Sequence, residues 1–302
     1  MLSFETKCGV KRMSFMKTSL KIIGLSVLAA ITFTACAPVT LLNTITPSGS
    51  FSKASDVSYG PLARQAMDIY KADTPKLGAP VIVFIHGGSW TEGSKDIYKF
   101  LAEGFTKDGY DIAVPNYRLY PETKYPGMIE DTAKAIAFVQ TQYPDRPLVL
   151  MGHSAGAYNM LMTVLQPSYL KASGGDLCGR IAGAISLSGP TGIIPLDSEP
   201  YITIFPDRFT ASDAPLNNVQ SAAPAILFGH GEDDKTVYPQ NSQALADKIT
   251  ARGGKAEVKI YDGVNHIEPV QFLSRHFDGK STIKADIIQF IDSLPKRGNF
   301  CQ

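Results

Sequence analysis

The sequence predicts an α/β protein in which helices flank a mostly parallel β-sheet. Short apolar runs typical of buried strands alternate along the chain with stretches of helical periodicity. Strands joined in this way require right-handed crossovers, so the loops that follow them gather at one edge of the sheet. The chain has 302 residues, of which 44% are hydrophobic, and this suffices for one large domain with a full core. We therefore expect functional side chains at the carboxyl ends of the strands.

The first half of the folded region supplies three strands and a helix. Residues 64–70 alternate polar and apolar side chains, as a half-exposed strand does. Residues 81–85 form an almost continuous apolar run, which is typical of a strand buried on both faces. Residues 111–114 give a further short strand. A helix follows, because four apolar residues share one face: Ile129, Ala133, Ile136 and Ala137.

The second half continues the alternation of strands and helices. Further strands are predicted over residues 148–151, 181–187, 225–229 and 256–261. Helices are predicted over residues 155–165, 239–250 and 283–294, the second of them with a proline at its first position. This order of elements supports the α/β class.

The N-terminal 36 residues are interpreted as a leader rather than as part of the fold. Basic residues precede an apolar run over 22–35, which is shorter than the roughly 20 residues of a transmembrane helix. The run ends in Phe-Thr-Ala-Cys, which resembles the lipobox of bacterial lipoproteins and implies lipidation of Cys36. An ordinary cleaved signal is the alternative. We expect a flexible tether over 37–55, a folded domain over 56–302, and a location in the cell envelope, periplasmic or at the outer surface.

Composition excludes several classes of partner and cofactor. The formal net charge is +1 and no basic stripe lies in the folded region, which argues against nucleic-acid binding. The four cysteines have no zinc-site spacing, so no metal is expected. In an oxidising compartment Cys178 and Cys301 can pair, and two free thiols are the alternative. The sequence leaves the oligomeric state open.

The central motif is Gly-His-Ser-Ala-Gly over 152–156, directly after a predicted strand. A serine hydroxyl needs an adjacent base and oxyanion donors to act as a nucleophile. A sharp strand-to-helix turn, made possible by flanking glycines, exposes Ser154 for this role. An ordinary turn is the alternative for the motif taken alone. The surrounding loops therefore decide the interpretation.

Three further loops supply the partners that such a nucleophile requires. His-Gly-Gly-Ser-Trp over 86–90 lets the backbone approach a substrate and donate to an oxyanion, with the amide of Ala155 as the second donor. Asp233 and Asp234 follow a later strand, and either one can orient a histidine. His266 follows the last strand and is the candidate general base. The order Ser, Asp, His fits this topology. The remaining histidines receive only structural interpretations: His86, His153, His230 and His276.

Together these motifs resemble the α/β-hydrolase superfamily, and within it the carboxylesterases related to hormone-sensitive lipase and the kynurenine formamidases. Asn-Tyr-Arg-Leu over 116–119 and His-Gly-x-x-Asp-x-x-Val over 230–237 complete the series. The resemblance implies an α/β-hydrolase fold, Ser154 as nucleophile, His266 as base and Asp234 as the acid, with Asp233 in reserve. It also implies an oxyanion hole from the amides of Gly87, Gly88 and Ala155, and no cofactor.

The resemblance also directs attention to the substrate pocket. Residues 189–223 are the one sizeable insertion and are expected to form a small lid, which suggests a small or short-acyl ester as substrate. Trp90, Phe205 and Phe209 are expected to contact this substrate, with local packing as the alternative. The predicted activity is that of a serine carboxylesterase attached to the membrane by a lipid. An amidase or aryl formamidase using the same triad, and an inert lipid-anchored binding protein, are the alternatives.

Overall fold

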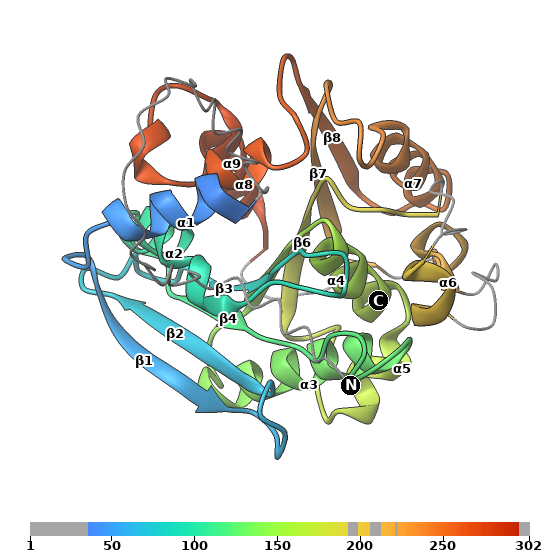
Figure 1. Ribbon diagram of the computed structural model, residues 1–302, viewed down its shortest axis with the longest axis horizontal. Coiled ribbons are helices and arrows are strands. Elements are labelled where there is room, and N and C mark those ends of the chain that lie inside the picture. Colours follow the sequence, from blue (N-terminus) through green and yellow to red (C-terminus); the bar gives the residue numbers. More distant parts are fainter. Residues whose placement is uncertain (1–35, 193–198, 206–212, 221–222, 296–302) are drawn as a thin grey trace, which may run out of the picture.

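A computed structural model describes residues 36–192, 199–205, 213–220 and 223–295. They form an eight-stranded sheet with the order β1-β2-β4-β3-β5-β6-β7-β8 (Figure 1). β1 pairs with β2 and β2 with β4 in the antiparallel sense, whereas the other five pairings are parallel. The predicted mostly parallel sheet is confirmed. Its strands are β1 (Phe51–Ser58), β2 (Ala66–Ala72), β3 (Val81–Ile85), β4 (Ile112–Pro115), β5 (Leu148–His153), β6 (Ile181–Leu187), β7 (Ala225–Gly231) and β8 (Ala256–Tyr261).

Helices cover both faces of this sheet. They are α1 (Cys36–Ile45), α2 (Lys99–Thr106), α3 (Gly127–Gln142), α4 (Ala155–Leu165), α5 (Pro167–Ala172), α6 (Tyr201–Ile204), α7 (Gln240–Ala251), α8 (Glu268–Gln271) and α9 (Ile283–Ser293), with 3₁₀ turns η1 (Lys95–Ile97), η3 (Pro215–Asn217) and η4 (Arg275–Phe277). Residues of α3, α4, α5 and α7 share one core layer, and residues of α2, α8 and α9 share the other.

The side chains of β3 illustrate how the sheet divides the core. Val81, Val83 and Ile85 point into the layer beneath α3 and α4, whereas Ile82 and Phe84 point into the layer beneath α2 and α9. Every residue of the strand is buried, because a parallel strand between two helical layers meets solvent on neither face. The predicted doubly buried strand is confirmed. It fixes the loop that begins at His86 above the centre of the sheet.

The tether predicted over residues 37–55 differs from the structure, because this segment contains α1 and the first half of β1. Leu42 is buried against the domain, and the Asn43 side-chain amide donates to the backbone oxygen of Asp96 over 2.8 Å. Phe51 packs edge-on against Tyr70, with their ring centroids 5.0 Å apart. These tertiary contacts order residues whose composition alone resembles a linker. The described fold therefore already includes α1 and most of β1 before residue 56.

Other predictions about the chain ends fall partly outside the described residues. Residues 1–35 of the leader predicted over 1–36, and Cys301, lie outside them. Cys178 takes part in a disulfide bond. Within the described ranges, no helix has the length and apolar content that a membrane crossing requires.

Candidate active site

The turn between β5 and α4 holds Ser154 in a strained backbone conformation, with φ 51°. A Cβ atom at Gly152 would lie 2.6 Å from the Cα of Ala157. A Cβ atom at Gly156 would lie 2.2 Å from the carbonyl oxygen of Ile85. Both glycines are therefore required by close packing of strand, turn and helix. The result is a sharp turn whose central side chain stands at the carboxyl edge of the sheet.

The structure brings Ser154, His266 and Asp234 into one hydrogen-bonded chain. The Oγ of Ser154 lies 2.9 Å from Nε2 of His266, and Nδ1 of His266 lies 2.7 Å from Oδ2 of Asp234. A carboxylate only accepts, so Nδ1 carries the hydrogen and Nε2 is left to accept from the serine hydroxyl. Asp233, the reserve candidate, is exposed, whereas Asp234 is buried. The geometry thus pairs the histidine with Asp234.

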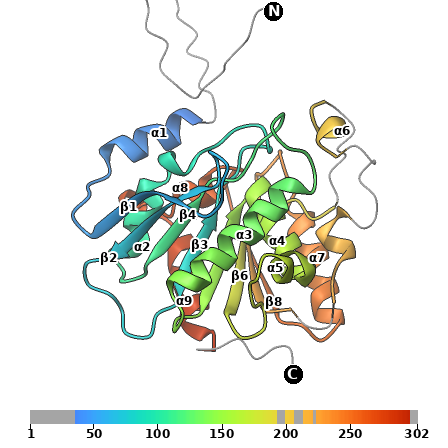
Figure 2. The ribbon, with the colours of Figure 1, turned by 90° about the horizontal axis from the view of Figure 1, so that it is seen from below.

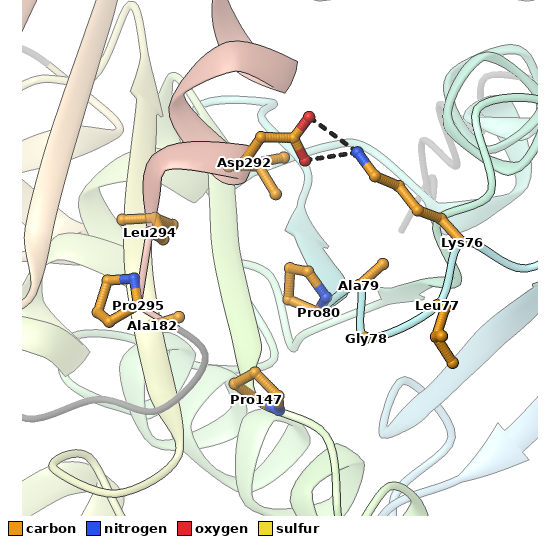
Figure 3. Close-up of a pocket in the computed structure, with 11 residues that line it drawn as sticks. Lys76, Leu77, Gly78, Ala79, Pro80, Pro147, Ala182, Asp292, Leu294 and Pro295 are labelled. Atoms are coloured by element: carbon orange, nitrogen blue, oxygen red, sulfur yellow. Dashed lines mark hydrogen bonds and ion pairs between the residues drawn. The ribbon is translucent and has the colours of Figure 1, made fainter.

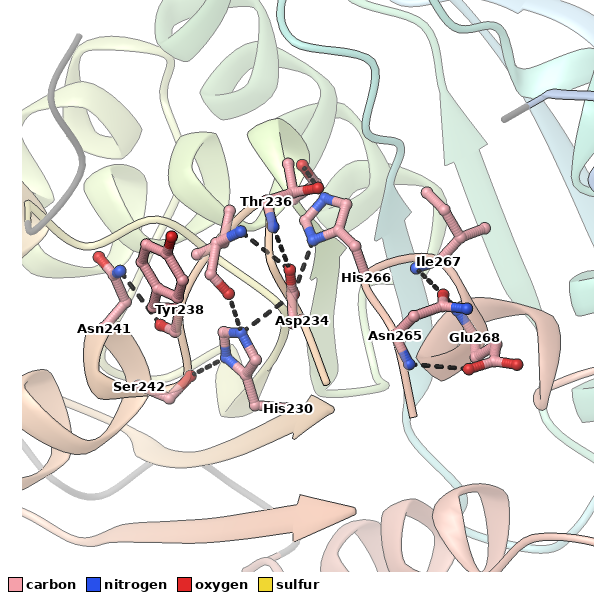
Figure 4. A network of polar contacts seen from close by, with 12 residues as sticks. His230, Asp234, Thr236, Tyr238, Asn241, Ser242, Asn265, His266, Ile267 and Glu268 are labelled. Atoms are coloured by element: carbon pink, nitrogen blue, oxygen red, sulfur yellow. Dashed lines mark hydrogen bonds and ion pairs between the residues drawn. The ribbon is translucent and has the colours of Figure 1, made fainter. Parts of the chain in front are cut away.

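The carboxylate of Asp234 is surrounded by donors (Figure 4). Its Oδ1 accepts from the backbone amides of Thr236 and Val237, each over 2.9 Å. Burial alone would raise the pKa of Asp234. Hydrogen bonds from His230, His266 and the Val237 amide outweigh burial and hold the pKa well below its usual range. The group is therefore ionised wherever the protein is folded at ordinary pH, as a partner for an imidazolium must be.

His230 is a member of this network that the sequence interpretation missed. Its Nε2 lies 2.7 Å from the carbonyl oxygen of Val237 and 3.1 Å from Oδ2 of Asp234. Both atoms are acceptors, so Nε2 carries the hydrogen, and Nδ1 accepts from the hydroxyl of Ser242 over 2.7 Å. The side chain is fully buried. The spacing of His230 four residues before Asp234 was the signal that could have identified it.

His153, also interpreted as merely structural, contacts the same histidine loop. Its Nε2 donates to the backbone oxygen of His266 over 2.8 Å, and the two rings lie 5.1 Å apart. Burial, followed by repulsion from His266, lowers the pKa of His153 to about 3. A neutral ring therefore ties the serine turn to the loop of His266. On the far side of that loop Asn265 Oδ1 accepts from the amides of Ile267 and Glu268.

The loop after β3 packs its backbone directly against Ser154. A Cβ atom at Gly87 would lie 2.9 Å from Nδ1 of His153 and 3.2 Å from Cβ of Ser154. Gly88, Ser89 and Trp90 all have positive φ, at 123°, 51° and 59°. This strained turn brings the predicted oxyanion residue Gly87 beside the nucleophile, whereas Gly88 packs against the backbone of Glu92. Ala155 begins α4, and amides in the first turn of a helix have no acceptor within that helix.

A cavity of about 130 Å³ opens beside the serine. It is lined by Ser89, Trp90, Ser154, Ala155, Pro190, Tyr201, Thr236 and Val237. Trp90 thus lies at the cavity, with its indole N–H held by Oδ1 of Asn159 over 2.9 Å. Phe205 is buried behind Trp90, with the ring centroids 5.1 Å apart, and is not among the lining residues. Phe209 lies outside the described residues.

A second cavity of about 170 Å³ lies at the opposite edge of the sheet (Figure 3). Lys76 Nζ pairs there with both carboxylate oxygens of Asp292, over 2.6 and 2.8 Å. The lining otherwise consists of proline, glycine, alanine and aliphatic residues. Within the part of the chain that the structure describes, no group of three or more His, Cys, Asp or Glu side chains is arranged to hold a metal ion.

Comparison with solved structures confirms the fold class. Esterase B from Lactobacillus rhamnosis superposes with a TM-score of 0.70 at 15% identity, covering 85% of this chain and 90% of that one. An esterase from the bacterial hormone-sensitive lipase family superposes with a TM-score of 0.66 at 18% identity, covering 84% and 88%. The fold and the arrangement of the site are those of an α/β-hydrolase.

The chain belongs to the BD-FAE family, whose model matches residues 67–249. The model of the prolyl oligopeptidase family also matches residues 207–294. An isoprenylcysteine alpha-carbonyl methylesterase of Arabidopsis thaliana is 25% identical over 270 residues, covering 80% of this chain and 62% of that relative. A kynurenine formamidase of Drosophila melanogaster is 23% identical over 223 residues, covering 69% and 73%. The matched part of the chain spans between half and about three fifths of the length of these methylesterase relatives.

Proposed function

We propose that the protein is a serine carboxylesterase that hydrolyses small or short-acyl esters through an acyl-enzyme. The observation that carries this proposal is the 2.9 Å contact between Ser154 Oγ and His266 Nε2, with Asp234 behind the imidazole. His266 takes the proton of Ser154 as the hydroxyl attacks the ester carbonyl, and Asp234 stabilises the imidazolium. The amides of Ala155 and of Gly87 or Gly88 hold the oxyanion.

The second half of the cycle uses the same groups. His266 gives its proton to the departing alcohol, which leaves an acyl group on Ser154. Water then loses a proton to His266, attacks the acyl carbonyl, and releases the carboxylic acid with the serine hydroxyl restored. No metal or organic cofactor is needed for these steps.

The size of the cavity supports a short acyl group. Its volume of about 130 Å³ is small beside the 300–1,000 Å³ of typical ligand pockets. The ring of Trp90 is fixed by Asn159, Tyr158 and Phe205, so it forms a rigid wall. We expect acetyl and butyryl esters to react faster than octanoyl esters because a longer chain has to displace this wall.

An aryl formamidase is the second candidate. The kynurenine formamidase relatives favour it, and a formyl group is the smallest acyl group that the cavity can accept. The same triad serves an amide, provided that His266 reaches the departing nitrogen. An inert lipid-anchored binding protein is less well supported, since each candidate residue of the triad has its partner.

The test is a substrate series on the purified chain, with p-nitrophenyl acetate, butyrate and octanoate beside an N-formyl arylamine. We expect the acetate or butyrate to have the highest kcat/KM, and a higher value for the formamide would move the assignment to formamidase. A fluorophosphonate probe should label the protein and its exposed-serine control Ser168→Ala, but not Ser154→Ala. Equal labelling of Ser154→Ala would contradict the role of this serine.

We also propose that the protein is an envelope lipoprotein attached through Cys36. The basic residues and the apolar run before this cysteine support the proposal. In a bacterial host the wild-type chain should incorporate labelled palmitate and sediment with membranes, whereas Cys36→Ser should do neither. Membrane association of the wild type without palmitate would contradict lipidation, and a soluble wild type would favour the ordinary cleaved signal.

A further inference from the structure

The exposed apolar side chains are concentrated on the side of the molecule that carries the catalytic cavity. Seven large apolar side chains are exposed among the described residues; of these, Leu77 lies at the amino edge of the sheet and Ile260 lies within the edge strand β8. The other five follow the carboxyl ends of strands or belong to α1 and α6: Leu41, Ile45, Leu62, Ile202 and Tyr238. Isolated exposed apolar residues are ordinary, but two of these five share one face of α1 and two directly follow residues that line the cavity.

Helix α1 is the first part of this surface. Leu41 and Ile45, which are 63% and 52% exposed, are four residues apart and so lie on one face of the helix. Leu42 points the other way, and the helix packs against α2 and η1. The bond from Asn43 to the backbone of Asp96 fixes it further. Its outer face is therefore held in a set orientation relative to the domain.

The mouth of the catalytic cavity is the second part. Tyr201 of α6 lines the cavity, and the next residue, Ile202, is 48% exposed. Thr236 and Val237 line it from the other side, and the next residue, Tyr238, is 57% exposed. Figure 2 shows α1 and α6 on the same side of the molecule, with the described chain ending at the opposite side. The cavity thus opens on the side to which α1 also contributes.

The remaining observation concerns where the chain leaves this surface. The apolar run over residues 22–35 directly precedes α1, and Cys36 is the first residue of this helix. No spacer therefore separates the proposed lipidation site from a helix that is packed on the domain. A lipid on Cys36 would hold α1 at the membrane surface, and the outer leucine and isoleucine of this helix would add apolar contact with the same surface.

We propose that this face lies on the lipid bilayer, so that α1 and α6 touch the membrane and the catalytic cavity opens toward it. The proposal depends on the lipidation of Cys36 and is independent of the esterase assignment. It implies that the ester substrates are molecules that partition into the membrane interface. The lipid anchor then fixes the orientation of the domain on the membrane, because no flexible linker separates the two.

Tryptophan depth measurements on the full-length lipidated chain test this orientation. Trp90 is the single tryptophan and is buried, so it gives a constant background. Leu41→Trp and Ile202→Trp report on the proposed contact face, and Leu77→Trp is the matched control at the opposite edge of the sheet. In vesicles of brominated phosphatidylcholine, we expect quenching of the first two reporters and none of Leu77→Trp. Equal quenching of all three, or none of Ile202→Trp, would overturn the orientation.

A second arm separates the bilayer from another copy of the chain as the occupant. Leu41→Ser/Ile45→Ser should lower the quenching of Ile202→Trp about twofold or more, because the apolar contact of α1 with the bilayer is lost. Leu77→Ser should not change it. Cys36→Ser should sediment as a monomer; a dimer that Leu41→Ser/Ile45→Ser dissociates would assign the face to a second copy. Hydrolysis of soluble p-nitrophenyl acetate, measured on the same samples, reports failure of the esterase proposal separately.

Discussion

The two cavities at opposite edges of the sheet have similar volumes but different chemistry. The cavity at the carboxyl edge holds a buried Asp234 that contacts His266, which contacts Ser154. The cavity at the amino edge holds Lys76 and Asp292, which form a partly exposed ion pair. The hydroxyl of Tyr110 also donates a hydrogen bond to Asp292. The larger volume belongs to the second cavity.

Burial and connectivity therefore distinguish the two sites better than size does. At the carboxyl edge Ser154, His266 and Asp234 are each held by a fixed donor or acceptor, so a charge that develops during reaction meets dipoles already in place. At the amino edge, solvent screens the ion pair, and the described residues that line the cavity include no serine, cysteine or histidine. The following changes test this difference, from the largest expected effect to the smallest.

Replacing the candidate base should have the largest effect. His266→Ala leaves Ser154 without an acceptor for its proton, so kcat/KM for p-nitrophenyl acetate should fall by about 10⁴- to 10⁶-fold. His276→Ala, at an exposed histidine on the same part of the chain, is the matched control and should retain wild-type kinetics. A comparable loss in both variants would indicate damage to the C-terminal fold instead of removal of a base.

Neutralising the acid should be almost as severe. Asp234→Asn keeps the shape of the side chain but favours the wrong imidazole tautomer, and kcat should fall by about 10⁴-fold. Asp233→Asn, at the neighbouring exposed carboxylate, should change kcat little. If Asp233→Asn is the inactive variant, the assignment of the acid has to move by one residue.

The buried His230 should have an intermediate effect. His230→Leu removes a donor from the ionised Asp234, and a hydrogen bond to a charged group contributes about 1.5–3 kcal/mol, which corresponds to roughly a 10- to 100-fold loss in kcat. KM should change much less, because His230 does not line the cavity. His230→Gln retains an N–H donor and should recover part of the loss. A change in thermal stability with no change in kcat would leave His230 a purely structural role.

His153 predicts a dependence of stability on pH. Its pKa falls from 6.5 to about 3 on folding, so between these values the unfolded chain binds a proton that the folded chain excludes. The free energy of unfolding should therefore decrease as the pH falls from about 6.5 toward 3. His153→Gln, which keeps a donor for the backbone oxygen of His266, should reduce this slope by up to about 1.4 kcal/mol per pH unit. Urea unfolding between pH 4 and 7 measures it, with His276→Gln as the exposed control.

The cavity at the amino edge should tolerate change. Lys76→Ala breaks the pair with Asp292, and partly exposed pairs contribute about 0–1 kcal/mol to the free energy of unfolding. Ester hydrolysis should be unaffected. A loss of activity above about tenfold, corresponding to 1.4 kcal/mol, would show that the two edges of the sheet are energetically coupled. The cavity at the amino edge would then contribute to catalysis.

Local patterns in the sequence were sufficient for strands β2 to β8, for helices α3, α4, α7 and α9, and for the residues of the serine turn. The run over residues 81–85 and the glycines around Ser154 each carry their structural meaning within a few residues, because burial on two faces and a tight turn depend on local side chains. The segment over residues 37–55 shows the limit of such reasoning. Its polar composition resembled a tether, and only contacts with residues far along the chain order it.

The sequence by itself determined the α/β class and the candidates Ser154, Asp234 and His266, because their order and loops are fixed by topology. Only the tertiary structure decided which neighbours support them. His153 and His230 looked like ordinary buried histidines, yet each donates to a group that positions or stabilises His266. It also decided that Trp90 lines the cavity whereas Phe205 packs behind it. Some of these contacts join residues that are more than a hundred positions apart in the sequence, as between His153 and His266. A local sequence pattern carries no information about contacts over such separations.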